Sequence, residues 1–133
     1  MRKTLPLLAL IAAGTSSAAT PDQLLQGYVA EARKAEAGFS PSPTRGEAMF
    51  RREHAGDKGP VACATCHTAD PRKEGRTRAH KAIAPLAPAA NPERLAEAAK
   101  AEKWFGRNCK DVLGRACTPA EKADFAAWLI SIR

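Results

Sequence analysis

Apolar residues at both ends of the chain recur every three or four positions, which is the spacing of one face of an α-helix. The first stripe follows Thr20-Pro21, a capping residue and a proline suited to the first helical turn. The second follows Thr118-Pro119, and Glu121 completes a capping box there. The stripes are Leu24, Leu25, Tyr28, Val29 and Ala32, and then Phe125, Trp128, Leu129 and Ile132. This pattern predicts a helix at each end of the chain.

Two more helices are expected between these. One runs from about residue 44 to residue 54 and carries Gly46 and Phe50 on one face. A small residue there lets another helix approach closely, and the apolar face of the C-terminal helix is the expected partner. The other begins at Asn91, a cap followed by proline, and extends to about Cys109. No segment alternates with period two, so the predicted fold class is all-α.

The first 19 residues have the pattern of an export signal. Arg2 and Lys3 give a positive start, residues 5–13 are apolar apart from Pro6, and Ser17-Ala18-Ala19 offers small residues for cleavage. The run is too short to span a bilayer, so a retained anchor is the less favoured interpretation. We expect cleavage near Ala18 or Ala19, one domain over residues 20–133, and a periplasmic location.

The run Cys63-Ala64-Thr65-Cys66-His67 carries the most specific chemistry in the sequence. Its spacing lets two thiols reach the two vinyl groups of a haem, and it places an imidazole under the iron. We therefore predict one covalent haem c, bonded through Cys63 and Cys66, with His67 as proximal ligand. A Cys-x-x-Cys pair alone would also suit a zinc half-site or a thiol redox motif, but the adjoining histidine and the export signal favour haem.

The Cys-x-x-Cys-His motif does not determine which residue binds the opposite face of the iron. No methionine follows Met49, which precedes the motif on a helix expected to be packed, so we interpret it as a core residue. His54 lies in the wrong part of the chain to cross to that face. The remaining candidates are His80, a lysine or an amide side chain. Among the amides, Asn108 follows Trp104 by four positions and shares its helix face.

Cys109 and Cys117 form a second cysteine pair, with no histidine after it and so no second haem site. In an oxidising compartment two leftover cysteines eight positions apart are expected to form a disulfide, with free thiols as the alternative. Gly114 allows the intervening turn. The bridge would join the end of the third helix to the start of the last and stiffen Asn108.

The positive net charge of the chain indicates which partners it could bind. The chain has 21 Lys and Arg against 14 Asp and Glu, and without residues 1–19 its net charge is 19 − 14 = +5. Such a charge would steer an exported protein toward an acidic redox partner or an anionic membrane surface, or would simply keep it soluble. The basic cluster between Arg72 and Lys81 is interpreted as a solvated face, one or two of whose cations pair with haem propionates. Nucleic acid is not an expected partner.

Three runs resemble the sphaeroides haem protein family of small monohaem class I cytochromes c. They are Ile83–Pro88, Glu102–Cys109 and Gly114–Pro119, and the resemblance extends from about Pro21 to the C-terminus. It implies a class I cytochrome c-like helical domain with an added N-terminal helix. It also implies residue roles: Asn108 as sixth ligand of the oxidised haem, Trp104 beside the haem, a Cys109–Cys117 disulfide, and the Pro85 carbonyl as acceptor for the N–H of His67.

The resemblance implies a function as well. Family members lose the asparagine on reduction and then bind oxygen, carbon monoxide or nitric oxide, and their suggested electron partner is a dihaem cytochrome c, often with a membrane cytochrome b. The leading hypothesis is a periplasmic haem protein that accepts electrons and binds a diatomic gas. Any turnover would be reduction of oxygen or a nitrogen oxide. The alternative is an electron shuttle ligated by His67 and His80. A peroxidase is less favoured, because no distal acid–base pair is evident.

Overall fold

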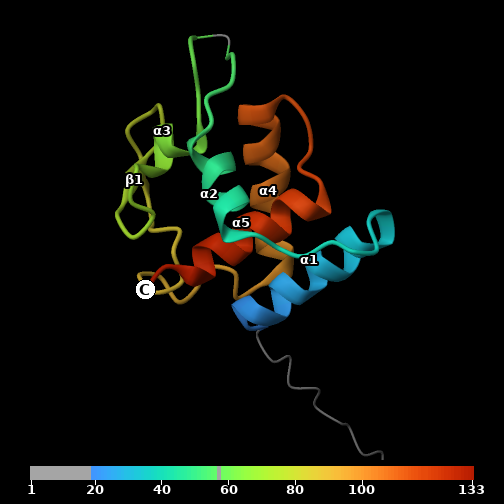
Figure 1. Cartoon of the computed structure of the whole chain (residues 1–133). Helices are drawn as coiled ribbons and strands as arrows, with labels where there is room; N and C mark the ends of the chain where they lie inside the picture. The colour runs from blue at the N-terminus through green and yellow to red at the C-terminus, as the bar shows by residue number, and fades with distance from the viewer. Residues whose placement is uncertain (1–18, 57) are drawn as a thin grey trace, which may run out of the picture.

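The computed structural model of the protein describes residues 19–56 and 58–133, so nearly all of the predicted export signal lies outside the described residues. The described chain is mainly helical, with one short antiparallel hairpin (Figure 1). The elements are α1 (Pro21–Ala35), α2 (Pro43–Arg51), α3 (Cys63–His67), β1 (Gly75–Arg76), β2 (Ala82–Ile83), α4 (Ala98–Leu113) and α5 (Pro119–Ser131). Within the described ranges, every helix is too short or too polar to cross a membrane.

The two terminal helices begin where the caps predict. The Thr20 hydroxyl accepts the N–H of Gln23 at 3.2 Å, and the Gln23 side chain accepts the N–H of Thr20 at 2.8 Å. Thr118 and Glu121 make the same reciprocal pair at 3.2 and 2.8 Å. Each pair satisfies two N–H groups that have no partner inside the helix, which fixes the first residue of α1 and α5.

The predicted contact between α2 and α5 is confirmed. Gly46 lies so close to α5 that a Cβ there would overlap the backbone carbonyl of Asp124 and come within 2.9 Å of the Trp128 Cβ. Phe50 is 0% exposed, and its ring centroid lies 4.7 Å from that of Trp128 and 6.1 Å from that of Phe125. The crossing therefore depends on a small residue at position 46 and on aromatic packing one turn later.

An ion pair fastens the start of α2 to the same helix. Asp124 is buried, and its carboxylate accepts hydrogen bonds from the Ser42 N–H at 2.7 Å and from Nε and Nη2 of Arg45 at 2.7 and 2.8 Å. A buried carboxylate needs such donors, because burial without them is costly. The Arg45–Asp124 pair thus orients α2 along α5.

A second hydrophobic cluster joins α1 to α5, and Phe105 of α4 connects it to the first. The Phe105 ring lies edge-on to Tyr28 at 5.7 Å and to Phe125 at 5.7 Å. The buried members of this second cluster are Leu24, Tyr28, Val29, Ala32, Phe39, Ala123 and Ala126. Phe105 therefore anchors the middle of α4 to both clusters.

Three predicted helix bounds are wrong, and one of them is the end of the third helix, which lies at Leu113 rather than about Cys109. The second helix ends at Arg51 rather than His54, because the backbone of His54 pairs with Val61 instead (N–H to O 2.8 Å and 2.9 Å). The helix expected from Asn91 begins at Ala98. Asn91 caps only a local turn, since its side chain accepts the N–H of Glu93 at 3.2 Å, and Leu95 has φ of 58°, which interrupts any helix.

Candidate haem site

The short helix α3 holds the whole Cys-x-x-Cys-His run. The Thr65 hydroxyl accepts the N–H of Ala62 at 2.9 Å, which fixes the start of the turn. Cys63 packs against the cluster formed by Phe50, Phe125, Trp128 and Leu129, so one end of the motif is attached to the α2–α5 core. Cys63 and Cys66 are both half-buried and both free of a disulfide.

The surroundings of Cys63 and His67 distinguish haem attachment from a thiol redox motif. Burial, reinforced by the nearby Cys66, raises the pKa of Cys63 to about 11, whereas a redox motif needs a lowered thiol pKa. Burial, with a smaller contribution from the positive charge of Arg94, lowers the pKa of His67 to about 4. His67 is therefore neutral at pH 7, the form in which imidazole binds a metal.

A zinc site would need further ligands around the motif. Within residues 19–56 and 58–133, no three His, Cys, Asp or Glu side chains lie close enough to hold one metal ion. The residues that the structure describes thus give the two cysteines no zinc-binding neighbours. Two unpaired thiols three positions apart, followed by a neutral imidazole, fit the attachment of one haem c.

The hairpin that follows is seated directly on α3. A Cβ at Gly75 would overlap the backbone carbonyl of Cys66 and come within 2.9 Å of the His67 Cα, so only glycine fits there. The strand pairing of Gly75 with Ile83 then fixes the returning strand. Sequence reasoning missed Gly75, because a glycine inside a basic run gives no sign of a close backbone contact.

Arg94 fastens the segment after the hairpin. Its guanidinium, half-buried, donates to the carbonyl of Ala84 at 2.7 Å and to that of Pro85 at 2.8 Å. Asn91 adds a third bond, from Nδ2 to the Pro85 carbonyl at 3.2 Å. Among the described residues no hydrogen bond joins His67 to Pro85, so the bond that the resemblance implies stays a prediction. Arg94 was also missed, since one arginine in an irregular segment carries no pattern.

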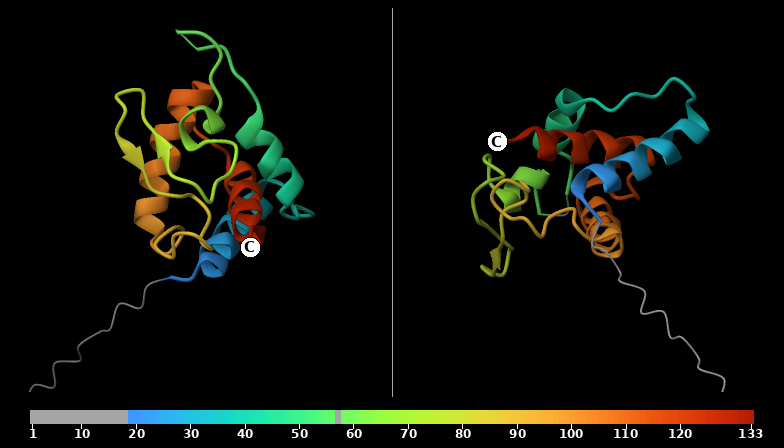
Figure 2. Two further views of the ribbon diagram at one scale, coloured as in Figure 1. Left: turned by 90° about the vertical axis from the view of Figure 1, so that its left-hand side faces the viewer. Right: turned by 90° about the horizontal axis from the view of Figure 1, so that it is seen from below.

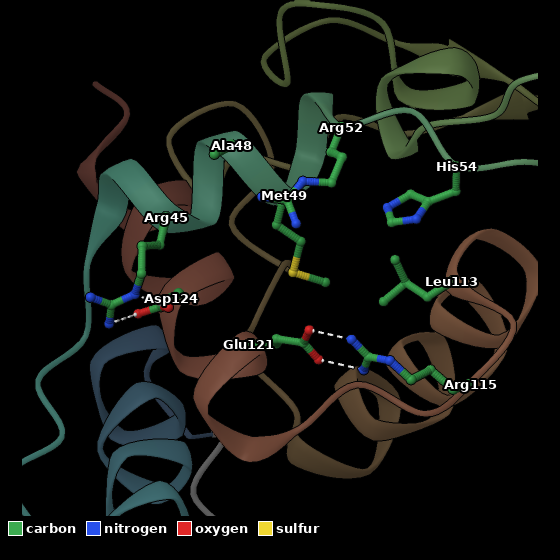
Figure 3. Close-up of a pocket in the computed structure, with 9 residues that line it drawn as sticks. All are labelled: Arg45, Ala48, Met49, Arg52, His54, Leu113, Arg115, Glu121 and Asp124. Carbon is green, nitrogen blue, oxygen red and sulfur yellow. Dashed lines mark hydrogen bonds and ion pairs between the residues drawn. The ribbon is translucent and has the colours of Figure 1, made fainter. Parts of the chain in front are cut away.

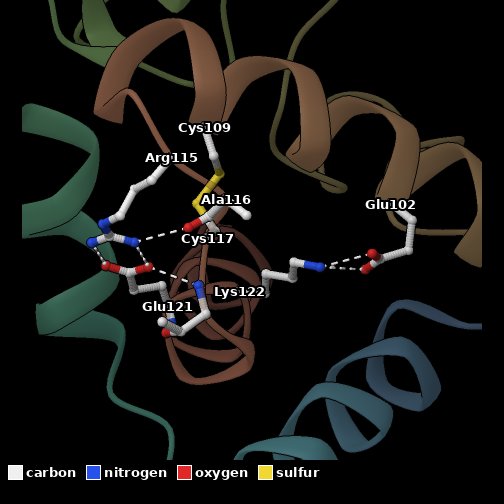
Figure 4. The surroundings of a disulfide bond; sticks show 8 residues. Glu102, Cys109, Arg115, Ala116, Cys117, Glu121 and Lys122 are labelled. Carbon is white, nitrogen blue, oxygen red and sulfur yellow. Dashed lines mark hydrogen bonds and ion pairs between the residues drawn. A yellow bond between two sulfur atoms is a disulfide. The ribbon is translucent and has the colours of Figure 1, made fainter.

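The residues predicted for the opposite face of the haem lie on α4. Trp104 is 38% exposed, a large apolar side chain at the surface, and Asn108 follows it one turn later, half-buried. Cys109 is buried and bonded to Cys117, with 5.6 Å between their Cα atoms (Figure 4). The predicted disulfide is therefore present. Figure 1 shows α3 and α4 to either side of α2, and the right-hand view of Figure 2 shows both of them on the same side of α5.

Comparisons with known proteins identify the family of the chain. A family model described as "Domain of unknown function (DUF1924)" matches residues 35–129. Over 126 residues the chain is 46% identical to "Cytochrome c-type protein SHP" of Cereibacter sphaeroides, covering 92% of this chain and 94% of that protein. The chain belongs to the SHP family of c-type cytochromes. As a member of this family it carries one covalent haem c.

Solved structures of this cytochrome family support the fold. Oxidised SHP, described as an oxygen-binding cytochrome c, matches with a TM-score of 0.75 and 47% identity, over 84% of this chain and 96% of that one. Oxidised cytochrome c'' from Methylophilus methylotrophus matches with a TM-score of 0.77 and 37% identity, over 84% of this chain and 93% of that one. The all-α cytochrome fold is confirmed.

The other ligand candidates belong to segments other than α4. His80 is exposed in the hairpin turn, with φ of 59°, and so belongs to the element seated on α3. Met49 and His54 line a cavity of about 210 Å³ beside Leu113, which two ion pairs, Arg45–Asp124 and Arg115–Glu121, flank (Figure 3). The cavity's lining includes neither Asn108 nor any residue of the haem motif. Met49 also packs on the Phe50 cluster, in agreement with its interpretation as a core residue.

Proposed function

We propose that this cytochrome is exported to the periplasm, accepts electrons and, once reduced, admits a diatomic gas at the haem face held by Asn108. The observation that carries the proposal is the position of Asn108, half-buried on α4 one turn after the exposed Trp104, in a chain closely similar to a protein described as an oxygen-binding cytochrome c. When bound, the haem would supply a one-electron iron centre, which Cys63, Cys66, His67 and Asn108 would hold.

His67 and Asn108 take unequal roles in this proposal. A neutral imidazole is a strong iron ligand in both redox states. An amide oxygen is a hard and weak donor that suits ferric iron and competes poorly for ferrous iron. We infer that Asn108 ligates in the oxidised protein and withdraws on reduction, which leaves its position open to oxygen, carbon monoxide or nitric oxide.

The disulfide restrains the backbone next to Asn108 while this side chain binds to or leaves the iron. Cys109 is the next residue after Asn108, and its bond to Cys117 ties the last turns of α4 to the start of α5. The backbone at Asn108 is therefore restrained, and withdrawal of the amide proceeds by rotation of the side chain. Trp104 lies one turn before Asn108 on the same helix face.

A simple shuttle ligated by His67 and His80 is the second candidate function. His80 is an exposed histidine in a loop, which leaves its imidazole available for ligation. However, the hairpin that carries it packs against Cys66 and His67 through Gly75, on the α3 side. The hairpin is thus held beside the proximal ligand, and this argument favours Asn108 over His80 as the ligand of the opposite face.

The remaining parts of the proposal rest on the family resemblance and on the N-terminal sequence. Residues 1–19 would direct export, with cleavage near Ala18 or Ala19 and a single domain over residues 20–133. A dihaem cytochrome c, with or without a membrane cytochrome b, is the proposed electron donor.

Two matched substitutions test the distal ligand. We expect Asn108→Ala to change the ferric absorption spectrum and to leave the ferrous spectrum without oxygen nearly unchanged, because the amide ligates only ferric iron. His80→Ala should alter neither state. If His80→Ala altered both states and Asn108→Ala altered neither, the distal ligand would be histidine and the shuttle would replace the gas-binding function.

A further inference from the structure

We propose that the β1–β2 hairpin with its flanks, residues 71–90, is the surface on which an acidic electron-donor protein docks. This inference rests on the proposed function in one respect, namely that the protein accepts electrons from another protein. It goes further in naming the surface and the charge of the partner. The name "hairpin surface" is used below for these residues.

The hairpin surface holds most of the net charge of the domain. Residues 71–90 contain five Lys and Arg and one acid, Glu74, so their net charge is 5 − 1 = +4, against +5 for all of residues 20–133. The other 94 residues together carry +1. The positive charge is thus concentrated in one short segment rather than spread over the surface.

This charge is also exposed and largely unneutralised. Lys73, Arg76, Arg78 and Lys81 are exposed, and within the described part of the chain none of them lies in an ion pair. Only Arg72 is paired, with Asp70 at 3.0 Å. Of the 14 Lys and Arg elsewhere in residues 20–133, six lie in an ion pair: Lys34, Arg45, Arg51, Arg107, Arg115 and Lys122.

The location of the hairpin surface connects it to the haem site. Gly75 is in van der Waals contact with the backbone of Cys66 and His67, the second attachment residue and the proximal ligand. The cations flank this glycine on both sides along the chain. A donor held by them would therefore lie beside the point where the haem is bonded to the chain, which shortens the path for an electron.

The chemistry of the hairpin surface favours a protein partner over a lipid surface. Segments that lie on membranes combine cations with large apolar side chains such as Trp, Phe or Leu. The exposed residues from 72 to 82 are charged, histidine or alanine, with no large apolar side chain among them. Trp104, which would suit a membrane, belongs to α4. Clustered charge without apolar anchors is suited to electrostatic steering of an acidic protein.

The test is the rate at which an acidic electron donor reduces the haem in the intact cytochrome. Flavodoxin hydroquinone serves as the acidic protein probe, and uncharged lumiflavin semiquinone serves as the control reductant. Arg76→Glu/Arg78→Glu is compared with Lys58→Glu/Lys100→Glu, in which two exposed cations outside the hairpin surface, neither of them in an ion pair of the described residues, are reversed. Both double variants lower the net charge by four, so only the location of the change differs.

We expect the hairpin variant to be reduced by flavodoxin about tenfold more slowly at low ionic strength, and the control variant by less than about threefold. The difference should disappear near 0.5 M salt, where such charges are screened. Lys73→Glu/Lys81→Glu, whose ammonium groups make no hydrogen bond in the described structure, should reproduce the loss. Lumiflavin should reduce all variants at the same rate.

Equal slowing in the hairpin and control variants would overturn the proposal, as would unchanged rates in both hairpin variants. Salt-resistant binding of the wild type to vesicles of anionic lipid, lost in Arg76→Glu/Arg78→Glu, would assign the surface to membranes instead. Carbon monoxide binding by the reduced wild type is measured on the same samples. Its absence would remove the gas-binding function and leave the docking result intact, so the two failures are distinguishable.

Discussion

The α2–α5 crossing and the segment from residue 68 to residue 97 flank the same haem motif, yet they are stabilised in different ways. The crossing consists of apolar packing, with Phe50 fully buried between Phe125 and Trp128. The segment is held by single polar contacts, above all the bonds of Arg94 to two carbonyls and the glycine seat on α3. We conclude that the core positions the motif, while individual polar contacts shape the surface around His67.

The largest expected effect on the free energy of unfolding comes from a substitution in the α2–α5 crossing. Gly46→Ala would force a Cβ into the Asp124 carbonyl, so α2 and α5 must separate, and we expect a loss of about 3 kcal/mol or more in the free energy of unfolding. Gly27→Ala is the matched control, because no atom lies within 4 Å of a Cβ at that position in α1. It should raise the free energy of unfolding slightly through helix propensity. Denaturant unfolding of the holoprotein measures both, and equal stability of the two variants would refute the close crossing.

A smaller loss of stability is expected from a substitution in the segment from residue 68 to residue 97. Arg94→Ala leaves the Ala84 carbonyl without a donor and the Pro85 carbonyl with Asn91 alone, and the half-buried position implies a loss of about 1–2 kcal/mol. Because the core is untouched, far-UV circular dichroism should keep its native shape, while the spectrum of the haem should shift through His67. Arg33→Ala is a suitable control: that guanidinium also donates to a backbone carbonyl, Phe39 O at 3.0 Å, but from α1. A haem spectrum that Arg94→Ala leaves unchanged would contradict the account of this segment.

These two regions also differ in how far the sequence predicts them. The capping boxes at Thr20 and Thr118 and the Gly46/Phe50 face were confirmed, because caps and helical periodicity depend on neighbouring residues. The start of α4 was predicted wrongly, since Asn91 caps only a local turn and the positive φ of Leu95 interrupts the helix. The haem motif could be recognised from five residues, but the contacts of Gly75 and Arg94 could not, because they lie in irregular segments where no periodic pattern marks them.

The smallest effect concerns the ion pair that caps α5. Hydrogen bonds from Arg115, at 2.7 and 2.8 Å, hold the pKa of Glu121 below its ordinary value. A carboxyl group whose pKa is lowered in the folded state adds stability above its unfolded pKa and loses it as the pH falls. Arg115→Ala should therefore lower the melting temperature slightly at pH 7 and leave it unchanged near pH 3. An equal loss at both pH values would show that Arg115 acts through packing.

The central claim is that Asn108 leaves the iron on reduction, so that its coordination position becomes free. The most direct measurement is the absorption spectrum of the ferrous wild-type protein before and after carbon monoxide is added, with oxygen excluded. The account predicts a ferrous spectrum without a strong sixth ligand, which shifts to that of a carbon monoxide complex on addition of the gas. A ferrous low-spin spectrum that carbon monoxide leaves unchanged would contradict it and would favour the shuttle ligated by two histidines.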